Sequence, residues 1–174
     1  MEFISVGLSA RGEEMDRAAA NVVYSISRQP TQEAVMSEPR RSLLRHGMLL
    51  FVLGIAAGFV EQGFTNPRMG LAAHLEGLMN GTFLLALGAV WAEVRLATKL
   101  KTVAYWGILY GAYANLVITT LAAIFGTAAM SPITGTGHIG QPWQESLVTI
   151  GFASVGLTMV GGTLLVLWGL RRGA

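Results

Sequence analysis

The amino-acid sequence predicts an all-α fold: a polytopic membrane protein built as a bundle of four transmembrane helices. Of the 174 residues, 52% are hydrophobic and only 13% are charged, which is not the balance of a soluble domain. No Lys, Arg, Asp or Glu occurs between Thr102 and Gln144. Four apolar runs each reach the roughly 20 helical residues needed to cross the hydrocarbon core of a bilayer, so four spans are predicted.

The predicted spans cover about residues 43–64, 71–92, 103–127 and 147–170. A short basic connection, EVRLATKLK, joins the second span to the third. The third and fourth are joined by AMSPITGTGHIGQPWQE, which is rich in Gly and Pro and long enough to fold over a site. Small residues recur along all four spans, a spacing that lets helices approach closely in lipid. Residues 41–174 are therefore expected to form one compact helical domain.

Residues 1–40 differ in kind from the rest of the chain. They hold six of the ten acidic residues, and they lack the order of basic, apolar and small-residue regions that marks a signal peptide. We expect a mobile cytoplasmic extension with a short amphipathic helix at about Glu13 to Ser25.

The distribution of Lys and Arg predicts the orientation in the membrane. They precede the first span, lie between the second and third, and follow the fourth: Arg40, Arg41 and Arg45; Arg95, Lys99 and Lys101; Arg171 and Arg172. The other two connections offer Arg68 alone. The positive-inside rule therefore puts both termini and the middle connection in the cytoplasm.

Composition also excludes some functions. The chain has no cysteine, which removes disulfides, thiolate metal sites and cysteine nucleophiles. Its basic residues flank apolar runs and form no patch, so no nucleic-acid partner is expected.

Three polar residues interrupt the start of the second span, in NPRMGLAAHLEGLMNGTF: His74, Glu76 and Asn80. An ionisable group inside a membrane helix is costly and marks a functional site by default. At about 100° per residue, Glu76 and Asn80 share one face of the helix, while His74 lies on another. Two functional surfaces on one helix are therefore predicted.

The histidine stands at one end of a strip of glycines, Gly77, Gly81 and Gly88. Taken alone, the glycines are typical of helix packing, and a lone histidine is typical of a hydrogen bond between helices. The alternative is that His74 is the axial ligand of a haem whose flat macrocycle lies along the strip, because a porphyrin needs both an axial nitrogen and a wall without side chains.

The third span carries two further surfaces. One is a stripe of small and weakly polar residues: Gly111, Asn115, Thr119, Ala122 and Gly126. The other is an aromatic arc of Trp106, Tyr110 and Tyr113, whose two tyrosines lie deep enough to line a pocket for a flat aromatic substrate. Asn115 either joins helices by a hydrogen bond or belongs to the site.

The two remaining histidines are not expected to be ligands. His46 opens the first span at the cytoplasmic side, whereas the second span starts at the opposite side. His46 and His74 should then be a membrane's breadth apart, which argues against a bis-histidine cytochrome. His138 lies in the Gly-rich third connection and is expected to be solvated.

The residues resemble a known family. FTNPRMGLAAHLEGLMNGTFLLALGAVW, followed by YGAYANLVITTLAAIFG and PWQE, is similar to the hydroxylaminobenzene mutases, small bacterial membrane proteins that convert hydroxylaminobenzene to 2-aminophenol. The resemblance covers about residues 45–170, and AHLEGLMNGTF is its most specific part. It implies a mutase, an intramolecular isomerase of nitroaromatic degradation, in the bacterial cytoplasmic membrane.

A more distant resemblance is to the styrene oxide isomerases, trimeric four-helix enzymes that bind haem b between subunits. His74 and Asn80 match their haem ligand and a site asparagine, which implies haem b as cofactor and a homo-oligomer, with a trimer favoured. Two departures matter: Gly111 stands where the isomerases carry an acid, and Thr119 stands where they carry a tyrosine. Haem ligation is therefore expected to carry over, and the substrate chemistry is not.

The leading interpretation is an isomerase that moves an oxygen from nitrogen to the aromatic ring, with ferric haem as Lewis acid. Glu76 would offset positive charge or move a proton, and Asn80 and Asn115 would orient the N–OH group of a small aromatic substrate. Tyr110 and Tyr113 would stabilise a cation through their ring faces. The alternatives are a haem-binding electron-transfer subunit, an epoxide isomerase, and a transporter or scaffold without chemistry.

Overall fold

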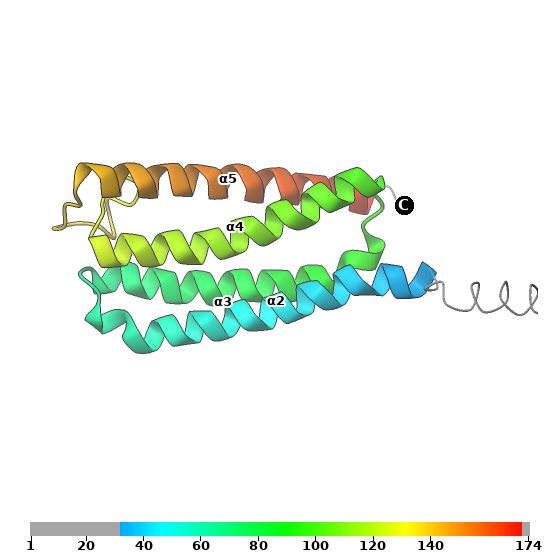
Figure 1. The fold of residues 1–174 in the computed structure, drawn as a ribbon, viewed down its shortest axis with the longest axis horizontal. Coiled ribbons are helices and arrows are strands. Elements are labelled where there is room, and N and C mark those ends of the chain that lie inside the picture. Colours follow the sequence, from blue (N-terminus) through cyan, green and yellow to red (C-terminus); the bar gives the residue numbers. More distant parts are fainter. Residues whose placement is uncertain (1–31, 172–174) are drawn as a thin grey trace, which may run out of the picture. The chain divides into compact units, whose positions relative to one another are not determined.

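Four long helices form the described part of the chain, which in the computed structural model is residues 32–171. They are α2 (Gln32–Val60), α3 (Pro67–Val90), α4 (Thr98–Phe125) and α5 (Pro142–Arg171) (Figure 1). Two short 3-10 turns, η1 (Glu61–Gly63) and η2 (Trp91–Glu93), follow α2 and α3. The helix predicted at Glu13 to Ser25, and most of the predicted extension, lie outside the described residues.

Four segments of the described chain are apolar and long enough to cross a membrane, one for each long helix: Glu38–Gly63, Pro67–Glu93, Thr98–Phe125 and Pro142–Arg171. The first two include the 3-10 turn that follows the helix. The prediction of an all-α membrane protein with four spans is therefore confirmed. Each helix begins four or more residues before its predicted span, because the polar and charged residues that precede the apolar run still continue the helix, whereas α2, α3 and α4 end two to four residues before the predicted ends.

Local sequence signals set the start of α3 and the end of α4. Asn66 caps α3, since its Oδ1 accepts a hydrogen bond from the Met69 amide at 3.2 Å, and Pro67 occupies the first turn. Helix α4 ends at Phe125 and is capped by Gly126, whose φ of 67° is the left-handed conformation that favours glycine. Its amide donates to Ala122 O at 2.9 Å.

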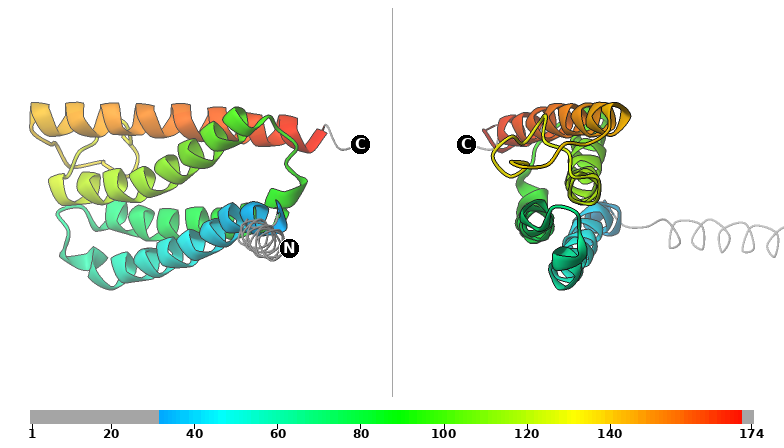
Figure 2. Two further views of the ribbon diagram at one scale, coloured as in Figure 1. Left: turned by 45° about the vertical axis from the view of Figure 1, so that its right-hand side comes forward. Right: turned by 90° about the vertical axis from the view of Figure 1, so that its left-hand side faces the viewer.

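From Pro39 onward the chain forms one compact unit. Within it α3 packs against α4, and α4 against α5. Figure 2 shows α4 between α5 on one side and the α2–α3 pair on the other. The main core lies where the helices meet and includes Leu50, Leu84, Trp91, Ile108 and Leu116. Helix α5 packs against α4 and is the least buried of the four spans, so much of its apolar surface is exposed.

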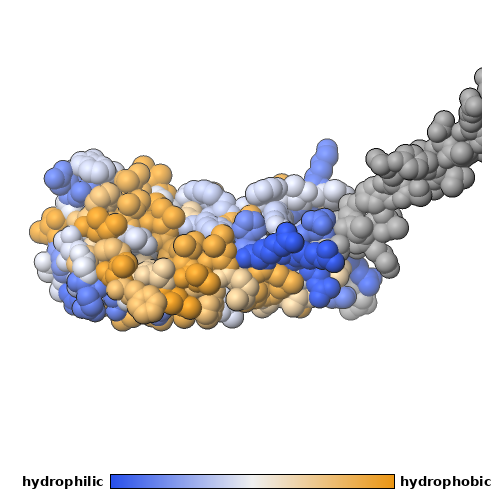
Figure 3. All heavy atoms as spheres, turned by 60° about the horizontal axis from the view of Figure 1, so that its bottom comes forward, coloured by the Kyte–Doolittle hydropathy of each residue, from blue (hydrophilic) through white to orange (hydrophobic). Residues whose placement is uncertain are grey.

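The exposed surface of this unit is largely apolar. Ile150, Leu157 and Leu164 of α5 are 70%, 78% and 59% exposed. Figure 3 shows a hydrophobic band on one face of the unit, with hydrophilic residues gathered toward its ends. Such a surface is stable in contact with lipid and not in water, in agreement with a membrane protein.

Candidate active site

Glu76 is the centre of a polar cluster between α3 and α4. Asn80 Nδ2 donates to Glu76 Oε2 at 3.2 Å, and Asn115 Nδ2 donates to the same oxygen at 2.5 Å. The predicted sharing of one helix face by Glu76 and Asn80 is confirmed, and α4 adds Asn115 to the pair. We refer to these three residues as the Glu76 cluster.

The second carboxylate oxygen of Glu76 is free in the described structure. No described residue donates a hydrogen bond to Oε1, and this oxygen is not fully buried. Two amide donors thus hold one oxygen in place, while the other is accessible and can accept a proton or a hydrogen bond. This is the arrangement that a proton acceptor needs.

His74 points to a different neighbour. Its Nδ1 lies 2.7 Å from the backbone oxygen of Gly54 in α2. Because a carbonyl oxygen only accepts, Nδ1 is the donor, and in the neutral ring this leaves Nε2 with the lone pair. The ring has space because α2 presents Gly58 here: a Cβ on Gly58 would lie 2.6 Å from His74 Nδ1.

The glycine strip of α3 is covered by α2. A Cβ on Gly81 would lie 2.7 Å from the Phe51 backbone nitrogen, and one on Gly77 would collide with the Gly54 backbone. The structure therefore supports the helix-packing alternative for Gly77 and Gly81. Because α2 fills the space beside these two glycines, no room is left there for a macrocycle. The prediction that Gly77 and Gly81 form a wall for haem is therefore wrong.

The two tyrosines of α4 do not line a common pocket. The Tyr113 hydroxyl lies 3.0 Å from His46 Nδ1 in α2, with the two rings edge to face. The Tyr110 hydroxyl lies 2.9 Å from Ser154 Oγ in α5, and Tyr110 is 51% exposed. Three residues apart on a helix, they turn toward different neighbours, and neither hydroxyl contacts the Glu76 cluster. The prediction that Tyr110 and Tyr113 line one pocket is therefore wrong.

His46 lies deeper than expected. It reaches Tyr113, well inside α4, and Gly54, which holds His74, follows it by only eight residues of α2. That is a rise of about 12 Å along the helix, less than half the hydrocarbon thickness of about 30 Å. The predicted membrane-wide separation is therefore wrong. The two Nδ1 atoms have different neighbours, Tyr113 for His46 and Gly54 O for His74.

His138 is not solvated as predicted. It is half-buried, its Nε2 lies 3.0 Å from Thr65 O, and its Nδ1 is buried without a partner among the described residues. The connection after α4 folds back onto the start of α3, which covers the ring.

The residues that hold this connection in place were not predicted from the sequence. Glu145, in the first turn of α5, accepts hydrogen bonds from the amides of Ala128, Ala129 and Gly140 at 3.0 to 3.3 Å. From α3, Asn66 Nδ2 donates to Thr134 O at 2.9 Å. The acid at the end of PWQE was the available signal, because a carboxylate at a helix start commonly accepts backbone amides.

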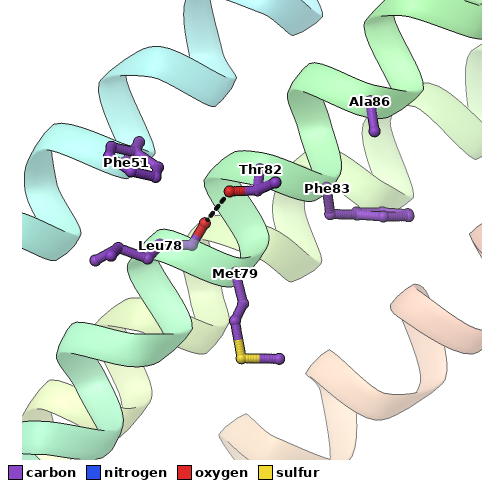
Figure 4. A pocket seen from close by; sticks show the side chains of 6 residues that line it. All are labelled: Phe51, Leu78, Met79, Thr82, Phe83 and Ala86. Atoms are coloured by element: carbon purple, nitrogen blue, oxygen red, sulfur yellow. Dashed lines mark hydrogen bonds between the residues drawn. The ribbon is translucent and has the colours of Figure 1, made fainter.

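A shallow, mostly apolar groove of about 480 Å³ lies on α3 beside α2, and the sequence analysis did not predict it. Its lining residues are Phe51, Leu78, Met79, Thr82, Phe83 and Ala86 (Figure 4). The one hydroxyl in it, Thr82 Oγ1, already donates to Leu78 O at 2.8 Å. The groove therefore offers apolar contact and little polar chemistry.

Comparison with known proteins places these features in a family. A family model described as styrene oxide isomerase matches residues 39–171. Hydroxylaminobenzene mutase HabB of Ectopseudomonas oleovorans is 44% identical over 132 residues, which cover 75% of this chain and 80% of HabB. Hydroxylaminobenzene mutase HabA of the same organism is 34% identical over 131 residues, or 75% of this chain and 97% of HabA. No solved structure matches significantly. The chain therefore belongs to the styrene oxide isomerase family, and hydroxylaminobenzene mutases are among its relatives.

Proposed function

We propose that the chain is a membrane mutase that rearranges hydroxylaminobenzene-type arylhydroxylamines to 2-aminophenols. The observation that carries the proposal is its similarity to two hydroxylaminobenzene mutases, one of which it matches over 97% of that protein's length. The Glu76 cluster supplies a chemical reason, because the reaction needs a group that accepts and returns a proton inside a membrane.

The rearrangement is balanced without an external reagent. The N–O bond breaks, and a C–O bond forms at the ring carbon ortho to the nitrogen. That carbon loses its hydrogen as a proton, and the nitrogen ends with one proton more. No electrons are gained or lost overall, so neither an oxidant nor a reductant is needed.

Glu76 is suited to the proton steps. Its Oε2 is held by Asn80 and Asn115, which fixes the carboxylate, and its accessible Oε1 accepts the proton released by the ring carbon. A carboxylate in this position also offsets positive charge that develops on nitrogen and ring as the N–O bond breaks.

His74 fits the role of haem ligand. Histidines that bind a metal typically donate their other ring N–H to a backbone carbonyl or a carboxylate, and His74 Nδ1 does so to Gly54 O. No described residue hydrogen-bonds Nε2, which is then the nitrogen that would hold the iron. A ferric haem b bound there would act as a Lewis acid on the hydroxylamine oxygen. An electron-transfer role has less support, because the other two histidines bond neighbours of their own, His46 the Tyr113 hydroxyl and His138 the Thr65 oxygen.

We further propose a homo-oligomer, with a trimer favoured by the family resemblance. His74 contacts α2 and Glu76 contacts α4, and residues two apart on a helix point about 200° apart. A cofactor on His74 and the Glu76 cluster of the same chain therefore face different directions, which supports a site completed by a neighbouring copy. The location proposed is the bacterial cytoplasmic membrane, with both termini in the cytoplasm.

The match to the styrene oxide isomerase model favours one second candidate, an epoxide isomerase. A single experiment separates the two. Protein purified in detergent is given hydroxylaminobenzene or styrene oxide without any electron donor, and products are identified by chromatography. We expect 2-aminophenol from the first and little turnover of the second. Aldehyde from styrene oxide without aminophenol would overturn the proposed function.

A further inference from the structure

Gly58 of α2 shapes the surroundings of the His74 ring. A Cβ added at Gly58 would lie 2.6 Å from His74 Nδ1, 3.0 Å from Cε1 and 3.1 Å from Cγ, so its three nearest neighbours belong to one imidazole ring. The other two glycines of α2 differ, because a Cβ on Gly47 or Gly54 would meet the backbone of α3. Those two let helix backbones approach, whereas Gly58 makes room for a side chain.

The missing side chain at position 58 also uncovers a hydrogen-bond acceptor. In a helix a side chain lies over the turn that precedes its own Cα, so a side chain at this position would cover the carbonyl of Gly54. A carbonyl oxygen has two lone pairs, and the helix uses one for the amide four residues later. His74 Nδ1 takes up the other, at 2.7 Å from the oxygen.

The bond from His74 to Gly54 O fixes the ring in two ways. It makes Nδ1 the donor, which leaves Nε2 of the neutral ring with the lone pair, and it holds the ring against α2. In metal sites, such a bond from the nitrogen that faces away from the metal orients the ring and raises the basicity of the ligating nitrogen. Glycine at position 58 is the condition for both effects.

We infer that Gly58 is a positioning residue: its missing side chain lets His74 donate to Gly54 O and so sets the tautomer and orientation in which Nε2 holds haem iron. The inference rests on the proposed function, in its assignment of haem to His74. A Cβ at position 58 need not unfold the protein, since the ring can turn away from it, but the hydrogen bond is then lost.

The test measures the bond between iron and histidine in the haem-loaded protein. Gly58→Ala should weaken haem binding about 10- to 100-fold, the usual effect of removing a hydrogen-bond partner of a metal ligand. It should also lower the iron–histidine stretching frequency in the Raman spectrum of the ferrous protein. The midpoint potential of the haem should rise, because a less basic ligand favours ferric iron less.

Gly47→Ala is the matched control. Its Cβ would strain the same contact between α2 and α3, at 2.9 Å from Gly81 O and from the Leu85 backbone nitrogen, but Gly47 lies about 16 Å from Gly58 along the helix. Gly47→Ala should lower Tm and leave the haem affinity, the stretching frequency and the potential unchanged. Equal effects of the two substitutions on these three values would indicate a packing role and would overturn the inference. Unchanged values in Gly58→Ala would overturn it too.

Two further measurements apply should Gly58→Ala not accumulate. Adding His74→Ala to the same chain should restore accumulation, because the ring that the new Cβ meets is then gone, and continued loss would contradict the inference. In the wild type the stretching frequency should exceed that of a haem–imidazole complex in apolar solvent, where the ligand has no acceptor. An equal frequency would again overturn the inference.

The wild type also separates this inference from the proposed activity. A wild type that binds no haem would overturn the assignment of haem to His74, and the role of Gly58 with it. A wild type that binds haem but forms no 2-aminophenol from hydroxylaminobenzene would overturn the proposed activity alone.

Discussion

The side-chain amides of Asn80 and Asn115 hold Oε2 of Glu76 in place, while Oε1 has no partner among the described residues. A substitution that removes the charge and keeps the shape therefore tests the proposed role of Glu76. Glu76→Gln keeps an oxygen for Asn80 and Asn115 and replaces the free oxygen with an NH₂ group, which cannot accept a proton. We expect the rearrangement to slow about 10- to 1000-fold, the effect of losing one well-placed proton-transfer or electrostatic group. Turnover of hydroxylaminobenzene measures it, with Glu93→Gln, at an exposed acid of η2, as the control. An unchanged rate in Glu76→Gln would reduce the cluster to helix packing.

His74 is the other residue on which the mechanism depends. His74→Ala should abolish or greatly weaken haem binding, because the iron then has no protein bond. The Soret band of the purified protein measures this, and added imidazole should restore part of it. The protein should still insert, since removing a polar side chain does not hinder insertion.

The matched controls for this prediction are the other histidines. His46 and His138 bond Tyr113 and Thr65, so His46→Ala and His138→Ala should keep the Soret band. A full band and full activity in His74→Ala would remove the ligand assignment.

At the scale of helices, the α2–α3 contact depends on glycine. Gly77 and Gly54 face each other so closely that a Cβ on Gly77 would collide with the Gly54 backbone, which a rotamer change cannot relieve. Gly77→Ala should therefore destabilise the protein by about 1–3 kcal/mol, the usual cost of overpacking. Thermal unfolding in detergent measures the effect. At Gly161 of α5 an added Cβ meets nothing within 4 Å, so Gly161→Ala should leave Tm unchanged or raised. Equal effects of the two changes would contradict the close α2–α3 contact.

For the whole molecule, the Lys and Arg distribution predicts a topology with both termini in the cytoplasm. Reporter fusions at Lys99 and after Ala174 should read cytoplasmic, and one near Gly137 should read external. The connection that contains Gly137 is tied to the starts of α3 and α5, through Thr134 and through the amides bound by Glu145. A cytoplasmic signal at Gly137 would show that α5 does not cross.

The parts of the candidate site that lie within one helix were predictable from sequence. Glu76 and Asn80 are four residues apart, and the helical repeat alone brings them together. The proximity of Asn115 was not predictable in this way, because it depends on how α3 and α4 are aligned along their length.

The sequence by itself determined the fold class, the four spans and the polar face of the second span, because hydropathy and helical periodicity are local properties. Only the tertiary structure decided which neighbour each face meets. It placed α2 on the glycine strip, turned Tyr113 toward His46 and Tyr110 toward Ser154, and covered His138 with the start of α3. The physical reason is that a helical pattern specifies the direction of a side chain around its own axis, whereas helix partners and their register are set by close packing between elements far apart in the chain.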